Sequence, residues 1–469
     1  MKTLARWLLV LAVMLGAPSL ATAQGDRRPN IIVILADDLG WGDLGVQGGR
    51  DVSTPNIDAL AAQGVRMTDF YANHPSCAPS RAALLSGRYQ HRFGFENNPG
   101  AAQQTSPEVA LPRDAGTLPE RLRGLGYATA MIGKWHIGFT PENLPTGRGF
   151  ERFYGFLDGA MAYTPQGRTG SKAMIRGVSP APMPAHTTEA FADEAVRFIR
   201  DQRERPFFLY VAFNAVHAPL QTTDAYLARV AHIADPQRRT YLAMLAAMDD
   251  AVGQIAAAAD ANGRETLIVF TSDNGGPTWQ TTSSNGPLNG VKALVLEGGI
   301  RVPTVLRWRG RLPQGAVSST VATGFDITAT ALAAAGAPRT RDLDGMDLTP
   351  ILTGARKAPT ARPLYWRLGP QGAMRAGDWK LIKAEDSWML FNLARDPGER
   401  TNLAAVEPER LAQMAADWRR WSGTMPEPKW GSLNRTGRAS RGEVRALIED
   451  FVQGRPVDPR SLLYGGGPE

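Results

Sequence analysis

Two pairs of oxygen-bearing side chains stand directly behind apolar runs of the sequence. The pair Asp37-Asp38 follows the run Asn30–Ala36, and the pair Asp273-Asn274 follows the run Thr266–Thr271. Hard cations such as calcium bind about six to eight oxygen ligands, and carboxylates supply the charge that holds them. Aspartate is also common in loops for conformational reasons. Two such pairs in matching positions, each with a glycine close behind, nevertheless predict a metal site.

The only cysteine of the chain, Cys77, stands in the segment Cys77-Ala78-Pro79-Ser80-Arg81. Disulfides need pairs, so a lone cysteine is bonded to another molecule, buried and inert, or chemically special. Pro79 suits the first turn of a helix. That helix would place residue 77 at its N-terminus, where backbone N–H groups and the helix dipole attract anions.

The apolar runs have the composition of strands that are buried on both faces of a parallel sheet. Stretches with helical apolar spacing separate them, and Thr54-Pro55 has the form of a helix cap and a first-turn proline. Strands that alternate with helices predict a doubly wound α/β domain, with a large mixed or parallel sheet flanked by helices. The predicted strands are Asn30–Ala36, Tyr127–Ile132, Pro206–Phe213 and Thr266–Thr271, and the predicted helices are Pro55–Gln63, Glu189–Arg200 and Tyr241–Ala259.

Each predicted strand is followed by polar side chains that could take part in chemistry. Lys134 and His136 follow the second strand, and Asn214–His217 follows the third. Ligands of open α/β sheets bind at the carboxyl ends of the strands. We therefore expect these residues to meet the two oxygen-donor pairs at one rim of the sheet.

The pattern of the sequence changes after residue 360. Short strands joined by glycine turns and one amphipathic helix are predicted there, followed by an irregular tail from Pro426 onward. We expect a catalytic α/β domain over residues 24–360 and a smaller C-terminal α+β domain over 361–469. Its predicted elements are strands at Leu364–Arg367, Ala373–Arg375 with Trp379–Ile382, and Met389–Leu393, and a helix at Pro408–Trp421.

The first residues have the features of a secretory signal. Lys2 and Arg6 precede the apolar run Trp7–Leu15, and Ala21–Ala23 offers a small-residue cleavage site, so residues 1–23 are predicted to be removed. The run is shorter than the roughly 20 residues of a membrane span, and no later stretch is expected to cross a bilayer. We predict a secreted or periplasmic protein without stable membrane insertion. Few cysteines and abundant Ala and Arg favour a bacterial periplasm.

The formal net charge is +7, of which Lys2 and Arg6 contribute two. This mild excess suits an anionic ligand. A nucleic-acid partner is not predicted, because the most basic stretch, residues 435–445, has no aromatic side chains for base stacking.

Taken together, these segments resemble the formylglycine-dependent sulfatase family (type I sulfatases). The segment Cys77–Arg81 is similar to the family's modification motif, and the likeness continues through Leu84–Arg88, where Ser86 stands at a position that more often holds Thr. Asp37–Asp43, Gly133–His136, Asp273–Gly276 and Leu390–Leu393 with Asp396-Pro397 also fit. The resemblance spans nearly the whole chain from Pro29 to Leu403 and implies an alkaline-phosphatase-like sheet.

The resemblance implies that Cys77 is oxidised by a formylglycine-generating enzyme to 3-oxoalanine (Cα-formylglycine), whose hydrate attacks sulfur. It also implies one bound Ca²⁺. The implied calcium ligands are Asp37, Asp38, Asp273, Asn274 and residue 77. The implied catalytic residues are Arg81, which anchors the diol; Lys134 and Lys292, which hold sulfate oxygens; His217, which protonates the leaving oxygen; and His136, which takes a proton from the second hydroxyl.

Within the family, Asn143–Phe150 and Val216–Gln221 resemble the arylsulfatase B branch. This implies an exo-acting carbohydrate sulfatase on sulfated galactosamine or galactose glycans, such as glycosaminoglycans, that also cleaves aryl sulfates. One alternative is a phosphoester or phosphonate-ester hydrolase of the same superfamily. The low number of histidines, 6, disfavours its two-metal form. The other is a catalytically silent glycan-binding protein on this scaffold.

Overall fold

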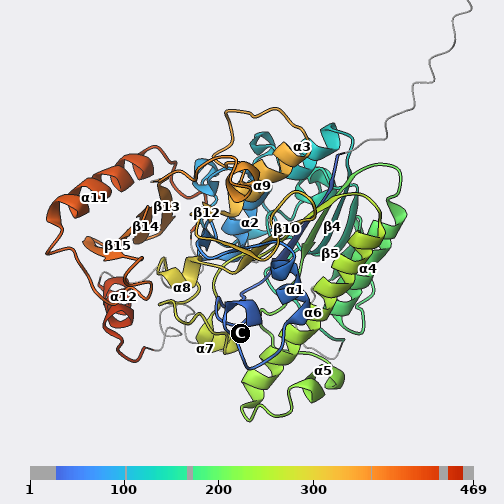
Figure 1. The fold of residues 1–469 in the computed structure, drawn as a ribbon, viewed down its shortest axis with the longest axis horizontal. Helices are drawn as coiled ribbons and strands as arrows, with labels where there is room; N and C mark the ends of the chain where they lie inside the picture. The colour runs from blue at the N-terminus through green and yellow to red at the C-terminus, as the bar shows by residue number, and fades with distance from the viewer. Residues whose placement is uncertain (1–27, 101–102, 166–172, 361, 432–441, 458–469) are drawn as a thin grey trace, which may run out of the picture.

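A computed structural model describes residues 28–100, 103–165, 173–360, 362–431 and 442–457 (Figure 1). The predicted signal segment 1–23 lies outside the described residues. The centre of the molecule is a ten-stranded sheet with the order β11-β2-β10-β9-β1-β8-β4-β5-β6-β7. These strands are β1 Asn30–Ala36, β2 Val65–Met67, β4 Ala128–Lys134, β5 Arg152–Phe156, β6 Met174–Arg176, β7 Ser179–Ala181, β8 Phe207–Ala212, β9 Thr266–Ser272, β10 Thr304–Trp308 and β11 Ala316–Ser318.

The five inner strands β9, β1, β8, β4 and β5 run parallel, as predicted for an α/β sheet. The outer strands make it mixed, because β10 pairs antiparallel with both β9 and β2, and β6 and β7 extend the other edge antiparallel. Successive side chains of a strand point to opposite faces. In β1, Ile32 and Ile34 belong to one core and Ile31 and Val33 to the other, and all are fully buried. This burial on both faces explains the continuous apolar run.

Helices cover both faces of the central sheet (Figure 1). One core packs α1 Pro55–Ala62, α4 Thr187–Asp201 and α6 Pro236–Ala261 against the sheet. The opposite core packs α2 Cys77–Ser86, α3 Leu118–Gly124 and α9 Gly324–Ala334. The short elements are β3 Phe70–Tyr71, β12 Ala322–Thr323, α5 Asp224–Arg229, α7 Thr278–Thr281, α8 Glu297–Ile300, α10 Thr349–Leu352, η1 Gly45–Gln47, η2 Gln90–Phe93, η4 Arg113–Ala115, η5 Pro141–Asn143 and η6 Pro145–Arg148.

By length and composition alone, helix α6 is long and apolar enough to cross a membrane. This corrects the expectation that no stretch after the signal segment is apolar enough to do so. Its most apolar window is 67% buried. Because its side chains from Tyr241 to Ala259 pack into the core against α1, α4 and the sheet, we interpret α6 as a core helix.

A four-stranded antiparallel sheet follows the central sheet, with the order β13-β14-β15-β16. Helix α11 Pro408–Gly423 packs on one face through Met414 and Trp418. The other face joins the rest of the molecule through a shared core that includes Leu294 and Phe391. The strands are β13 Leu364–Leu368, β14 Gln371–Ala376, β15 Trp379–Ala384 and β16 Ser387–Asn392.

The prediction of an irregular tail after Pro426 is wrong. Helix α12, Glu443–Gln453, lies in this region and buries Val444, Leu447, Ile448 and Val452 in the core that the small sheet shares with the central domain. These side chains lie on one face of a helix because they occupy positions i, i+3, i+4 and i+8.

Candidate active site

The predicted site residues come together at the carboxyl ends of the inner strands. The strand ladder continues into the loops, since the N–H of Asp37 donates to the carbonyl of Ala215 at 2.9 Å and that of Asp273 to Ala36 at 3.1 Å. Asp37 and Asp38 follow β1, Asp273 and Asn274 follow β9, Lys134 ends β4 with His136 two residues later, His217 follows β8, Cys77 and Arg81 lie in α2, and Lys292 precedes α8.

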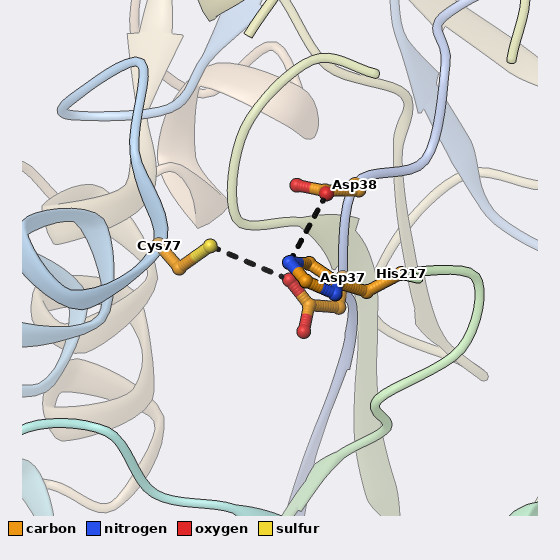
Figure 2. Close-up of side chains that lie close together, drawn as sticks. All are labelled: Asp37, Asp38, Cys77 and His217. Carbon is orange, nitrogen blue, oxygen red and sulfur yellow. Dashed lines mark hydrogen bonds and ion pairs between the residues drawn. The ribbon is translucent and has the colours of Figure 1, made fainter. Parts of the chain in front are cut away.

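Asp37 lies at the centre of one group of contacts, and Figure 2 shows its contact with Cys77. Its Oδ2 is 2.5 Å from Lys134 Nζ and 3.7 Å from an Arg81 nitrogen, and its Oδ1 is 3.5 Å from Cys77 Sγ. Burial acts to raise the pKa of the Asp37 carboxyl, but Lys134, His217 and Arg81 together lower it below its ordinary value. Asp37 is therefore held as a carboxylate beside the thiol.

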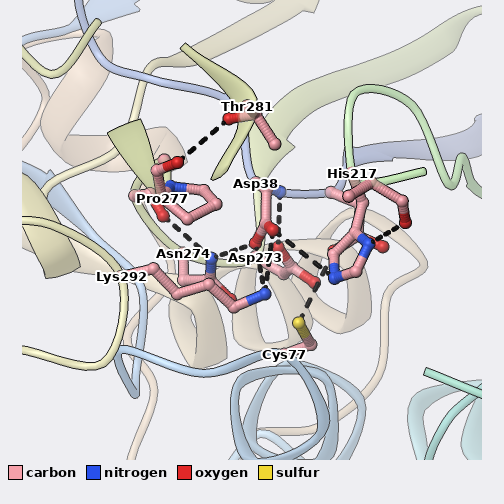
Figure 3. A network of polar contacts seen from close by, with 12 residues as sticks. Asp38, Cys77, His217, Asp273, Asn274, Pro277, Thr281 and Lys292 are labelled. Atoms are coloured by element: carbon pink, nitrogen blue, oxygen red, sulfur yellow. Dashed lines mark hydrogen bonds and ion pairs between the residues drawn. The ribbon is translucent and has the colours of Figure 1, made fainter. Parts of the chain in front are cut away.

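Asp38 joins three other predicted residues (Figure 3). Lys292 Nζ lies 2.7 Å from its Oδ1 and 2.8 Å from its Oδ2. Asn274 donates an amide hydrogen to Oδ1 at 2.7 Å, and His217 Nε2 is 3.5 Å from Oδ2. The two aspartates of the first pair thus have different partners.

Arg81 is fully buried and fixes Asp273. Its Nε and one terminal nitrogen donate to Asp273 Oδ2 at 2.9 and 2.7 Å, and the other terminal nitrogen donates to the carbonyl of Lys134 at 2.9 Å. Burial would lower the pKa of Arg81, but Asp273 and Asp37 raise it, so the guanidinium stays charged. Burial and the neighbouring Asp37 raise the pKa of Asp273, which is the effect of crowding carboxylates.

The donor set fits a hard divalent cation. Ligand atoms of Asp37, Asp38, Cys77 and His217 all lie within 4.8 Å of one another. Asn274 borders this group, and its Oδ1 is buried with no hydrogen-bond partner among the described residues. A buried amide oxygen normally has a partner, and amide and carboxylate oxygens are the ligands that calcium prefers. A cation beside Asp38 would supply that partner.

The charges of the site balance. Three carboxylates face three cations, and burial lowers the pKa of both histidines, which favours their neutral forms. A divalent cation would give the site a net charge of about +2, which suits an anionic group. The carboxylates are Asp37, Asp38 and Asp273, and the cations are Arg81, Lys134 and Lys292.

Cys77 is the first residue of α2, after the cap position Ser76, and only 1% of it is exposed. Burial raises the pKa of its thiol to about 12, although Lys134 and Lys292 oppose the shift. The thiolate is the reactive form of cysteine. An unmodified Cys77 would therefore be a weak nucleophile at neutral pH.

The two histidines differ in exposure. The His217 side chain is 14% exposed, whereas His136 is 4% exposed. His217 Nδ1 is 2.5 Å from the carbonyl of Ala218, which leaves Nε2 directed toward Asp38. His136 Nδ1 is buried and has no hydrogen-bond partner among the described residues. His217 is therefore the more accessible of the two histidines.

Asp38 and His136 have left-handed backbone conformations, with φ of 63° and 64°. Such residues cost about 1–3 kcal/mol each and persist only where the surroundings impose them. For His136, part of the surroundings is Gly159, where an added Cβ would lie 2.8 Å from the imidazole Cε1. Glycine at this position lets the chain pass close to the ring.

Tyr163 also belongs to this site, although no local sequence pattern indicates it. Its buried hydroxyl donates to the carbonyl of Asn214 and lies 2.9 Å from that of His217. Its N–H donates to the side chain of Gln221 at 2.9 Å. Tyr163 thereby holds the loop that carries His217. Its separation of 54 residues from His217 explains why sequence reasoning missed it.

Two family models match the chain. Residues 29–337 match the model described as Sulfatase, and residues 291–418 match the model described as N-sulphoglucosamine sulphohydrolase, C-terminal. The two matches overlap in the segment that carries Lys292.

Curated proteins and solved structures agree with these matches. The chain is 33% identical over 465 residues to N-acetylgalactosamine-6-sulfatase of Sus scrofa, with 87% of each chain covered. It is 34% identical to human (Homo sapiens) arylsulfatase A, with 85% of this chain and 89% of the other covered. The chain is 33% identical to Ps i-CgsB, whose structure in complex with k-i-k-neocarrahexaose matches with a TM-score of 0.81. This match covers 93% of this chain and 99% of the other.

Proposed function

Because this chain belongs to the sulfatase family and is a sulfatase enzyme, we propose that it hydrolyses glycan sulfate esters with a formylglycine made from Cys77 and one calcium ion. The resemblance found in the sequence and the alkaline-phosphatase-like fold are confirmed. The roles of individual residues are part of the proposal.

One observation supports this proposed mechanism most strongly. A lone, fully buried cysteine at a helix N-terminus lies 3.5 Å from a carboxylate, inside a group of acidic oxygens and balancing cations. A neutral thiol is a poor ligand for a hard cation, whereas the hydrated aldehyde would offer oxygen at the same position. The diol would supply one hydroxyl to attack sulfur and a second to release sulfate.

The other residues of the site would bind the metal, bind the sulfate group or orient residue 77. Asp37, Asp38, Asp273 and Asn274 would hold calcium with residue 77. Lys134 and Lys292 would bind sulfate oxygens, where their charges stabilise the negative charge that develops in the transition state. Arg81 would orient the residue 77 side chain while it fixes Asp273.

His217 would protonate the leaving oxygen, because it is the more exposed of the two histidines. His136 would accept a proton from residue 77.

We propose sulfated galactosamine or galactose glycans as substrates, attacked from a chain end. The similarity of the chain to N-acetylgalactosamine-6-sulfatase and to a protein solved in complex with k-i-k-neocarrahexaose supports this class. We also propose export to a periplasm after removal of residues 1–23. N-terminal sequencing of the secreted or periplasmic protein tests the cleavage site.

The test of the function is a sulfate-release assay on a chain co-expressed with a formylglycine-generating enzyme. Defined sulfated galactosamine and galactose oligosaccharides are compared with nitrophenyl sulfate and with phosphate and phosphonate esters, and Cys77→Ala is the control. Sulfate release that requires residue 77 supports the proposal. Faster turnover of a phosphorus ester would favour a phosphoester or phosphonate-ester hydrolase, and glycan binding without turnover would favour a silent binding protein.

A further inference from the structure

The loop that carries Lys292 is held from the C-terminal part of the chain at three points. Asn289 donates its side-chain N–H to the carbonyl of Phe451 in α12 at 3.0 Å. The N–H of Glu297 donates to the carboxylate of Glu399 at 2.7 Å. Between these two contacts, the side chain of Gln371 reaches the backbone directly after Lys292.

Gln371 makes a two-point contact with this backbone. It is the first residue of β14 and is fully buried. Its Nε2 donates to the carbonyl of Ala293 at 3.0 Å, and its Oε1 accepts the N–H of Val295 at 3.2 Å. An amide supplies one donor and one acceptor in this arrangement, which neither a carboxylate nor an apolar side chain reproduces.

The residue held in this way has a strained backbone. Ala293 has φ of 68°, a left-handed conformation that alanine rarely adopts. Its N–H donates to the carbonyl of Pro75, two residues before Cys77, at 2.8 Å, and the N–H of Lys292 donates to the carbonyl of Gly276 at 3.3 Å. The conformation of Ala293 therefore sets how the Lys292 segment meets the Cys77 loop and the end of β9.

We infer that Gln371 is a positioning residue, which holds Ala293 in its left-handed conformation and so keeps the Lys292 ammonium beside Asp38. The C-terminal sheet then contributes to the active site through the backbone of the Lys292 loop. This inference rests on the proposed function only for the catalytic role of Lys292. The conformation of Ala293 and the contact between Lys292 and Asp38 do not depend on that role.

The test uses Gln371→Met, which keeps the side-chain length and removes both hydrogen bonds. Misplacing a catalytic group by about 1 Å can cost roughly 10²-fold in rate, so kcat/KM for nitrophenyl sulfate should fall by about 10- to 100-fold. Adding Ala293→Gly should recover most of this loss, because glycine adopts positive φ without strain. In a Lys292→Ala background, Gln371→Met should have less than about a 3-fold effect, because residues that act as a unit are not additive.

Trp418→Phe is the matched control. Trp418 packs against Gly372 and donates to the carbonyl of Trp366, so its change disturbs the same sheet without reaching the Lys292 loop. It should lower Tm and leave kcat/KM within about 2-fold of wild type. A purely structural role of Gln371 would give additive losses and no rescue by Ala293→Gly, which would overturn the inference.

A crystal structure of Gln371→Met separates this inference from the proposed function. Wild-type protein that releases no sulfate would refute the function alone. If Ala293 keeps its positive φ and Lys292 stays in contact with Asp38 in the variant, the positioning role is refuted whatever the reaction is. Movement of both would support it.

Discussion

Replacing His217 by alanine should impair the enzyme in proportion to the difficulty of the leaving group. His217 Nδ1 lies 2.5 Å from the carbonyl of Ala218, so Nε2 is the atom that faces the site, and the side chain alone among the candidate catalytic groups is more than a tenth exposed. A sugar alkoxide needs a proton as it leaves, whereas a nitrophenolate leaves easily without one.

General acid catalysis contributes about 10²–10⁴-fold, which corresponds to roughly 2.7–5.4 kcal/mol at about 1.36 kcal/mol for each tenfold. His217→Ala should lose this factor on a sugar sulfate and less than about tenfold on nitrophenyl sulfate. The ratio of the two losses is the diagnostic quantity. The exposed His232 offers His232→Ala as the control, with no expected change on either substrate.

The pH dependence of the sugar-sulfate reaction should have a definite sign. Burial lowers the pKa of His217 below its ordinary value, although Asp38 opposes the shift. A general acid must be protonated, so kcat/KM should fall as pH rises through a pKa below 6.5. His217→Ala should remove this fall. Equal losses on both substrates, with the pH profile unchanged, would refute the assignment of His217 as the acid.

Three further predictions concern residue 77, the metal and the second sheet. Turnover should scale with the fraction of residue 77 converted to the aldehyde, as measured by peptide mass spectrometry. Metal-free protein that keeps the Cys77 thiol should resist iodoacetamide at pH 7, because burial raises the pKa of that thiol. Rapid alkylation would contradict this reasoning. Calcium should raise the Tm of wild type, because a ligand that binds the folded state stabilises it. Asn274→Ala should need at least about tenfold more calcium for the same rise in Tm. An unchanged calcium titration would show that Asn274 is not a ligand. Burial, together with Glu297, raises the pKa of Glu399 to about 7. The protonated Glu399 therefore contributes to the free energy of unfolding fully below pH 4.5, the ordinary pKa of the group, and this contribution is lost as pH rises through 7. Glu399→Gln should therefore raise Tm relative to wild type at pH 8 and not at pH 5, and an equal shift at both would exclude this titration.

The strand ends could be predicted because parallel strands carry their following loops to one edge of the sheet. The predicted strand Asn30–Ala36 has the bounds of β1, and the helix inferred from Pro79 begins at Cys77. These elements depend on local composition, which a single sequence contains. The roles of the residues gathered there remain proposals.

The contacts that position the site could not be predicted from local patterns. Gln371 meets Ala293 across 78 residues, and nothing near either residue indicates the pair. Helix α12 was missed for a different reason. Its apolar spacing is present in the sequence, but so short an amphipathic helix is stable mainly through packing, which local composition does not show.

The burial of Cys77 has a consequence for the order of events in biosynthesis. Its thiol is at the base of a site closed by α2, the strand ends and the Lys292 loop, and only 1% of the residue is exposed. The oxidising enzyme of the proposed function would need access to the motif Cys77–Arg81, in which Arg81 is fully buried against Asp273 and Lys134. Under the proposed function, conversion would therefore have to precede folding. Molecules that fold first would keep the thiol, so the yield of active protein would depend on the relative rates of modification and folding.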